Sequence, residues 1–432
     1  MLQPPIPVRR ARGVVQVPPG SGSAEASGPH PALVEVAAGR GLPAVADPMP
    51  LLRSALEHGL AGLLLTEVEQ SDQPWRRLVL GVLRARQATV EAWHERLWTE
   101  LGSISGLLEG MGVEVAIAKG IAAEARWYSR RGERPCTDLD LLLRPSDLPR
   151  VDDIIEAVEP THPLLGRTRR LAEDGYLQSV DLVHHGVPID LHWDILKIGV
   201  PSRNLDAIWE RTVPLPLPGG GSVRALDAET SYVHFLVHLN KDRFRRLLGF
   251  VDAARVFERG DLDGGAVDRL VRADGLDTVV GSSWNVVVDT LDLPAPHRHV
   301  APGLRPLVWK VAWRPSLRLQ AGESRTRFRH RQVLIALLGP GRAGETATAW
   351  LRGRFPPAEL LSYVHSVYAR RWGGEPVSGA EHGWVWSLTV GRVQAWSGRR
   401  RAIRGSTTRR GSTAPPAPGG SARRSGGVAT PR

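Results

Sequence analysis

Residues 137–143 read Thr-Asp-Leu-Asp-Leu-Leu-Leu, an apolar run that carries two aspartates and lies between Pro135 and Pro145. Its length and composition predict a buried β-strand. Because side chains alternate between the two faces of a strand, Asp138 and Asp140 lie on the same face. Two carboxylates this close repel each other unless a cation lies between them. The segment therefore predicts a site for a divalent cation that prefers oxygen ligands, Mg²⁺ or Mn²⁺.

A second acidic strand follows about fifty residues later, where residues 187–193 read Val-Pro-Ile-Asp-Leu-His-Trp. Asp190 is the third candidate metal ligand, and it shares a face with His192 and, if the strand extends that far, with Asp194. Three aspartates on adjacent strands can hold two metal ions for phosphoryl transfer. The alternative for each acid is a solvated position at the end of a strand. His192 either orients a substrate or is a hydrogen-bonded structural residue.

A Lys-Gly pair precedes the first acidic strand. Residues 113–118 alternate as a short strand, Lys119 and Gly120 follow it, and residues 121–130 have the pattern of a helix. Glycine at such a turn lets the backbone approach a phosphate group at the start of the helix. Lys119, one of only four lysines in the chain, either reaches a triphosphate or is a solvated or helix-capping residue.

Helical patterns surround this unit on both sides. We expect helices over 48–110, a hairpin over 176–193, helices over 227–257, and weaker helices near 277–292, 327–338 and 357–371. The predicted organisation is a disordered arm over 1–45, a helical region over 46–112, a mixed α/β unit over 113–225, a helical domain over 226–375 and a mostly disordered tail over 376–432. The fold class is therefore α+β.

Composition excludes several classes of protein. The 432 residues are 42% hydrophobic, which is enough for a sizeable core and excludes a wholly disordered chain. No window of 18 uninterrupted apolar residues predicts a membrane span, and no apolar stretch of a secretory signal follows the early arginines. Cys136 is the single cysteine, so an internal disulfide is excluded and a reducing, cytoplasmic setting is expected. We interpret its thiol as a bystander because the sequence indicates no base beside it.

The formal net charge of +11 is concentrated at one end of the chain. Residues 398–432 contain nine arginines and no acidic residue, so the remainder is nearly neutral. This argues against a nucleic-acid-binding face on the folded part. The arginine-rich tail either makes non-specific contacts with polyanions or has no binding role, and it offers no aromatic residue for base stacking.

The ordered set of motifs resembles the nucleotidyltransferase superfamily typified by DNA polymerase β. That pattern is a strand, a glycine turn, a helix, a strand with two acids at alternate positions and a later strand with a third acid. The chain resembles more closely an uncharacterised bacterial nucleotidyltransferase family. The residues that carry this resemblance, within roughly 50–260, are Ala118-Lys-Gly-Ile121, Trp127-Tyr128, Arg134, Thr137-Asp-Leu-Asp140 and Ile189-Asp-Leu-His-Trp193.

The resemblance implies a palm, a small mixed sheet with helices, flanked by helical regions. It implies that Asp138, Asp140 and Asp190 are the catalytic metal ligands, with Asp190 as the base. Lys119 and Gly120 are expected to bind the nucleoside triphosphate (NTP). Ile121 departs from the wider superfamily, which has serine or glycine after the turn glycine.

Two further nucleotide-binding candidates also come from the resemblance. Arg134 matches the arginine near which the family's aromatic-rich helix ends, and His238 lies on the histidine-bearing helix that follows the palm. His234 and His238 are four residues apart and share a helix face, a spacing that also suits zinc, but no third ligand follows them.

The implied function is metal-dependent transfer of a nucleoside monophosphate from an NTP to an unidentified acceptor, with a small molecule or a protein favoured. The alternative is a catalytically degenerate protein that keeps the fold and serves in binding or regulation, with the tail as its contact element. Deletion of residues 397–432 distinguishes these two hypotheses.

Overall fold

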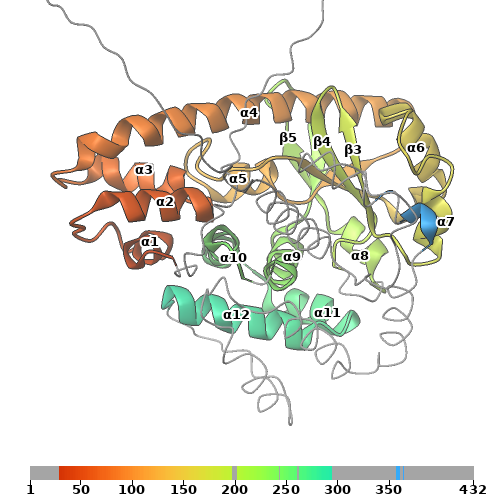
Figure 1. Ribbon diagram of the computed structural model, residues 1–432. Coiled ribbons are helices and arrows are strands. Elements are labelled where there is room, and N and C mark those ends of the chain that lie inside the picture. Colours follow the sequence, from red (N-terminus) through yellow and green to blue (C-terminus); the bar gives the residue numbers. More distant parts are fainter. Residues whose placement is uncertain are drawn as a thin grey trace, which may run out of the picture. The chain divides into compact units, whose positions relative to one another are not determined.

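The structure is a computed structural model that describes residues 29–196, 202–242, 244–259, 262–293, 357–360 and 363. The chain divides into two compact units, Met1–Trp350 and Leu351–Arg432, and the elements described below belong to the first. This unit has the predicted α+β fold, in which one mixed sheet of six strands is flanked by helices (Figure 1).

Helices precede and follow the sheet in the sequence, and others connect its strands. The bounds of the helices in the described part of this unit are α1 (Pro31–Ala37), α2 (Pro48–His58), α3 (Ala61–Gln70), α4 (Arg76–Gly110), α5 (Ile121–Trp127), the 3-10 helix η1 (Pro145–Arg150), α6 (Val151–Val158), α7 (Thr168–Glu173), α8 (Leu205–Glu210), α9 (Ala228–Lys241), α10 (Leu247–Arg259), α11 (Gly264–Ala273) and α12 (Asp277–Leu291). The strands are β1 (Val115–Ile117), β2 (Leu139–Leu143), β3 (Ser179–His184), β4 (Val187–His192), β5 (Val213–Pro216) and β6 (Ser222–Ala225).

The strand order β3-β4-β2-β1-β6-β5 brings the two acidic segments together. β2 pairs in parallel with β4, so that Asp140 is the register partner of Asp190. β1 is antiparallel to β2, and its end leads directly into Lys119 and Gly120. β3 and β4 form the predicted hairpin. The centre of the sheet thus gathers the strand ends that carry the candidate site.

α4 is a 35-residue helix that spans the unit from α2 and α3 to the β3–β4 hairpin (Figure 1). The buried residues of α4 recur every three or four positions, which is the spacing of one helix face, and most of them are apolar. Members of that face include Val79, Leu83, Val90, Leu97, Leu101, Ile104 and Leu108. α4 therefore connects the N-terminal helices to the sheet, and it confirms the helix expected over this segment.

Three expectations fail in detail. Residues 31–37 lie in the predicted disordered arm but form α1, because Leu33 and Val36 are buried against other helices. Residues 213–225 contain a hairpin, β5 and β6, where prolines indicated only a loop. Proline lacks an N–H donor and is tolerated in an edge strand, which is where β5 lies. The helical stretch over 227–257 is divided between α9 and α10, and Phe244 between them has a left-handed φ of 54°.

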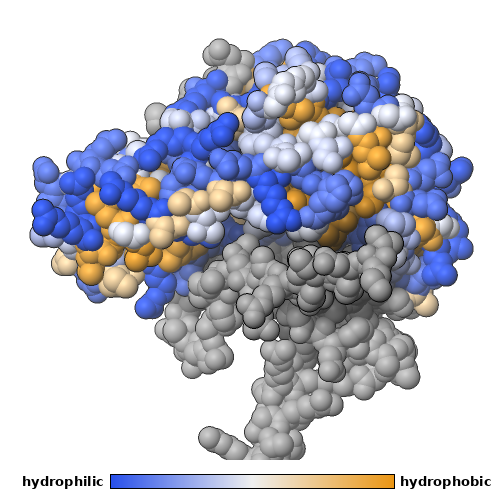
Figure 2. Space-filling view, turned by 90° about the horizontal axis from the view of Figure 1, so that it is seen from above, coloured by the Kyte–Doolittle hydropathy of each residue, from blue (hydrophilic) through white to orange (hydrophobic). Residues whose placement is uncertain are grey.

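Some expectations fall outside the described residues. These are the helix near 327–338, most of the helix near 357–371, and most of the two tails. None of the described helices combines the length and apolarity that a membrane span requires. Figure 2 shows the side along which α4 runs, and this face is mainly hydrophilic with separate hydrophobic areas.

Candidate active site

Asp140 and Asp190 lie side by side on the sheet because they are register partners on the parallel strands β2 and β4. Asp138 directly precedes β2, two residues before Asp140, and is half-buried. All three carboxylates act electrostatically on the ammonium group of Lys119. The structure therefore brings together the three acids that the sequence indicates. Asp194 does not join them, because its carboxylate accepts hydrogen bonds from the backbone N–H and hydroxyl of Ser202.

His192 bridges two of these acids. Its Nε2 atom lies 3.2 Å from Asp140 Oδ1 and 3.2 Å from Asp190 Oδ2. Burial alone would lower the pKa of this imidazole, but the two carboxylates outweigh burial and raise the pKa to about 9. His192 is therefore an imidazolium at neutral pH, and it offsets part of the negative charge of the acidic pair.

Lys119 supplies a second positive charge at the same place. Its Nζ atom lies 2.9 Å from Asp140 Oδ1 and 3.1 Å from His238 Nε2. Burial acts to lower the pKa of Lys119, but Asp140, Asp138 and Asp190 raise it above its usual value. The protonated ammonium donates to His238 Nε2, which leaves the Nδ1–H of that ring to face Asp242 Oδ2 at 3.3 Å. The structure thus places His238 at the acidic cluster through Lys119.

The cluster has the donor chemistry of a divalent-metal site. Desolvation acts to raise the pKa values of Asp140 and Asp190. Lys119 and His192 outweigh this effect for Asp140, and His192 is the main group that outweighs it for Asp190. Both pKa values are therefore lowered, and both groups are carboxylates. Among the described residues, no group hydrogen-bonds to the buried Oδ1 atom of Asp190. The carboxylate oxygens of Asp140 and Asp190 lie within 4.8 Å of each other, and the protonated ring of His192 lies within the same distance of both. Ionised carboxylates suit Mg²⁺ or Mn²⁺ when one of their oxygen atoms has no other hydrogen-bond partner.

Gly120 forms the turn between the end of β1 and α5. Its φ of 60° and ψ of −125° belong to a region that side chains disfavour, so glycine is required on conformational grounds alone. Ile121 is fully buried as the first residue of α5 and packs in the core. This explains the departure at that position, because Ile121 anchors the helix start through its side chain.

Arg134 holds this turn from the protein interior. Its Nε and one terminal nitrogen donate to the two carboxylate oxygens of Asp252 on α10 at 2.8 and 2.9 Å. Its other terminal nitrogen donates to the carbonyl of Gly120 at 3.3 Å. The hydroxyl of Tyr128 also donates to Asp252, at 2.6 Å. The structure thus places Arg134 in a buried network with the turn, where its guanidinium reaches the nucleotide-binding candidate Gly120 through the backbone.

Two other expectations about individual residues are clarified. His234 Nδ1 lies 3.1 Å from the carbonyl of Ile195, and burial lowers the pKa of this imidazole well below its usual value. It does not share a metal-binding group with His238 among the described residues. Cys136 does have a base beside it, since its Sγ lies 3.2 Å from Nε2 of the buried His94. Burial raises the pKa of the thiol, so Cys136 stays protonated.

The sequence reasoning missed Asp252, the acid that fixes Arg134. A signal was present, because Asp252 is an acid in the apolar pattern of residues 247–257, and a buried acid needs a cationic or hydrogen-bonding partner. It also missed His94, whose Nδ1 lies 2.8 Å from Glu124 Oε2 on α5. Nothing in the sequence alone pairs positions so far apart.

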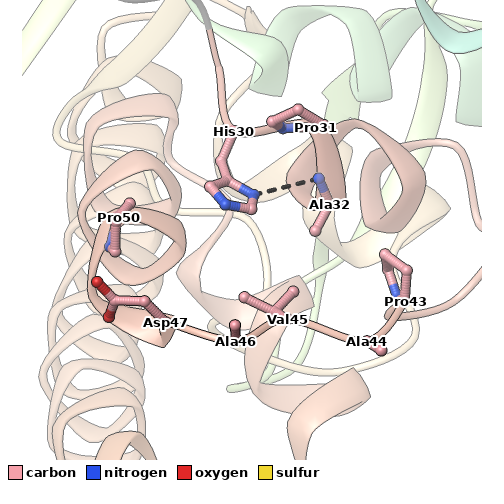
Figure 3. Close-up of a pocket in the computed structure, with 9 residues that line it drawn as sticks. All are labelled: His30, Pro31, Ala32, Pro43, Ala44, Val45, Ala46, Asp47 and Pro50. Carbon is pink, nitrogen blue, oxygen red and sulfur yellow. Dashed lines mark hydrogen bonds between the residues drawn. The ribbon is translucent and has the colours of Figure 1, made fainter.

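A pocket beside the N-terminal helices shares no lining residue with the carboxylate cluster (Figure 3). It is formed by residues of α1, α2 and the segment between them, and its lining is His30, Pro31, Ala32, Pro43, Ala44, Val45, Ala46, Asp47 and Pro50. The two polar side chains, His30 and Asp47, accept hydrogen bonds from Ala32 N–H and Met49 N–H as helix caps. The carboxylate cluster, and not this pocket, gathers the candidate residues.

Comparison with known proteins yields one finding. Neither the curated proteins nor the solved structures give a match to this chain. The family model described as "Uncharacterised nucleotidyltransferase" matches residues 45–292, a range that contains β1 to β6 and every residue of the carboxylate cluster. The chain belongs to this uncharacterised nucleotidyltransferase family.

Proposed function

We propose that the protein transfers a nucleoside monophosphate from an NTP to an acceptor, a small molecule or a protein, in a reaction that depends on Mg²⁺ or Mn²⁺. The observation that carries the proposal is the meeting of Asp138, Asp140 and Asp190 around Lys119, next to the Gly120 turn. The nearly neutral charge outside the arginine-rich tail favours an acceptor other than long nucleic acid. The single cysteine favours a cytoplasmic location.

The three aspartates would hold the metal ions. When bound, such ions neutralise the triphosphate and lower the pKa of an attacking hydroxyl. Asp190 is suited to the role of base, because it is ionised, its Oδ1 atom has no hydrogen-bond partner among the described residues and its Oδ2 atom is held by His192. A carboxylate fixed through one oxygen can accept the proton of the acceptor hydroxyl at the other.

Lys119 and the turn at Gly120 would bind the triphosphate. Within the described residues, Asp140 and His238 account for two of the three N–H groups of the ammonium, which leaves one for a phosphate oxygen. The backbone at Gly120 has no side chain to keep a phosphate away. His192 keeps Asp140 and Asp190 ionised and aligned. The acceptor oxygen, having lost its proton to Asp190, would bond to the α-phosphorus while the bond from that phosphorus to pyrophosphate breaks, and pyrophosphate would leave.

The test is NTP turnover by the full chain with Mg²⁺, followed as release of pyrophosphate and as transfer of α-labelled phosphate to a panel of hydroxyl-bearing acceptors and to the protein itself. We expect Asp190→Asn to lower the rate by about 10²- to 10⁴-fold, the range that a general base contributes. Asp153→Asn, at an exposed position on α6, is the matched control and should retain the rate. Full activity of Asp140→Asn or Asp190→Asn would contradict the proposal and favour the alternative, a catalytically degenerate protein with a role in binding or regulation.

A further inference from the structure

A second group of metal-ligating side chains lies away from the three aspartates, where the tip of the β3–β4 hairpin meets α4. Glu100 of α4, His184 at the end of β3 and His185 in the turn place one ligand atom each within 4.8 Å of one another. One helical turn before Glu100, Arg96 donates a hydrogen bond to the carbonyl of His185 at 2.6 Å. Two residues on the same face of α4 therefore contact this hairpin tip. Figure 1 shows α4 running past β3 and β4.

The carboxylate of Glu100 has an unusual setting. Its side chain is only 7% exposed, and its ion-pair partners among the described residues are two imidazoles, with no lysine or arginine. His184 Nδ1 contacts Oε1, and His185 Nδ1 lies 3.3 Å from Oε2. Both imidazoles approach this carboxylate through ring nitrogens, the atoms that bind metal ions, and a buried carboxylate needs a cationic or hydrogen-bonding partner. A divalent cation bound to the three groups would place a positive charge directly at this carboxylate.

The backbone of the turn is shaped to bring the two imidazoles together. Consecutive residues of a strand point to opposite faces. Here His185 and Gly186 both have left-handed backbones, with φ of 45° and 78°. The ring centroids of His184 and His185 are 3.9 Å apart. Asparagine, aspartate or glycine usually occupies the first position of such a turn. A histidine there costs backbone energy, and what it provides is a second ring nitrogen at Glu100.

We propose that Glu100, His184 and His185 form a binding site for a transition-metal ion, with Zn²⁺ as the best match. Two imidazole nitrogens and one carboxylate oxygen are a ligand set that zinc accepts, with water completing the coordination. Mg²⁺ prefers all-oxygen sites and suits the aspartate cluster instead. His185 is 69% exposed, which gives an ion access from solvent. The bound ion would tie α4 to the hairpin whose second strand carries Asp190 and His192.

The test measures Zn²⁺ binding to the full-length protein, prepared without a histidine tag and stripped of metal, in competition with a chromophoric chelator. We expect one equivalent of Zn²⁺ with micromolar or tighter affinity. His185→Asn, which retains a residue suited to the left-handed turn, should weaken binding at least tenfold. His30→Asn is the matched control, because asparagine can replace the α1 cap, and it should bind zinc unchanged.

Two further measurements separate this site from the aspartate cluster and from misfolding. The double variant Asp138→Asn/Asp140→Asn should keep the zinc equivalent. Zn²⁺ should raise the melting temperature of the wild type but not that of His185→Asn, whose metal-free melting temperature reports whether it is folded. Absence of zinc binding would overturn the proposal, as would unchanged binding by folded His185→Asn or loss of the equivalent in the double aspartate variant.

Discussion

At the residue scale, the candidate site is a balance between three acids and two cations. Lys119 and His192 both contact Asp140, and they keep the carboxylates ionised where burial alone would favour protonation. An apolar sheet accepts this group of charges because they compensate one another. The same carboxylates suit a metal ion. Lys119 and His192 therefore stabilise the ionised carboxylates of the folded site.

Arg134 is expected to act on nucleotide binding through the Gly120 turn. Arg134→Lys keeps the charge but loses the planar fork that reaches Asp252 and the Gly120 carbonyl together. We predict that the Kd for an NTP rises about tenfold, the equivalent of about 1.4 kcal/mol. The measurement is titration of a non-hydrolysable NTP analogue into the folded variant in the presence of Mg²⁺.

The matched control for this prediction is Arg259→Lys. Arg259 donates a single hydrogen bond, 3.0 Å long, to the carbonyl of Trp127 at the other end of α5, and lysine can replace it. The control should bind the NTP analogue as the wild type does. Equal affinity in Arg134→Lys and the wild type would show that the buried network has no part in nucleotide binding.

The sequence indicated most of this site but not its support. Asp138 and Asp140 can be recognised from the sequence because they are acids in an apolar strand segment. Asp190 has the same pattern on the neighbouring strand. Asp252 lies 118 residues from Arg134, and the packing of α10 against α5, the helix before the Arg134 segment, brings the two together. A single sequence contains no information that pairs them. Local pattern therefore predicts ligands, whereas supporting contacts depend on tertiary structure.

At the element scale, the position of the segment before Arg134 depends on a close approach to α3. A Cβ atom built on Gly62 would lie 2.6 Å from Cα and 2.8 Å from the carbonyl oxygen of Glu133. These are backbone atoms, so Gly62→Ala must shift either α3 or the segment leading to the candidate site. Glycine is thus required here for close packing.

We predict that Gly62→Ala lowers the free energy of unfolding by about 1–3 kcal/mol, the usual cost of overpacking. Gly81→Ala is the matched control, because its helix position in α4 is exposed and no atom lies within 4 Å of the added Cβ. That change should stabilise the protein by up to about 1 kcal/mol through helix propensity. Denaturant titration of both variants measures the free energy of unfolding, which should fall in Gly62→Ala and stay the same or rise in Gly81→Ala. A free energy of unfolding in Gly62→Ala that is not lower than in Gly81→Ala would contradict this prediction.

Element boundaries were predictable where periodicity was strong. The long helix α4 and the hairpin β3–β4 follow directly from spacings of three to four and of two residues. β5 was missed because Pro214 and Pro216 are typical of loops, although an edge strand tolerates them. α1 was missed because its seven residues follow a stretch rich in proline, glycine and serine, and its burial comes from other helices.

At the scale of the whole molecule, the central claim is that the palm binds an NTP through a divalent metal ion. The family match over residues 45–292 supports nucleotidyl transfer as a class. The acceptor is not predictable from the sequence in the same way, because acceptor recognition depends on the shape and polarity of surfaces assembled from distant segments. The proposed nucleotide site, by contrast, depends on a few charged residues with characteristic spacing.

The most direct measurement is isothermal titration of the full chain with a non-hydrolysable analogue of each NTP, with and without Mg²⁺. The same titration is made with Asp138→Asn/Asp140→Asn and with a matched double control, Asp72→Asn/Asp153→Asn, whose positions are exposed. We predict Mg²⁺-dependent binding of at least one NTP by the wild type and the control, and loss of this binding in Asp138→Asn/Asp140→Asn. Absence of NTP binding by folded wild type, or equal binding by the folded Asp138→Asn/Asp140→Asn variant, would contradict it.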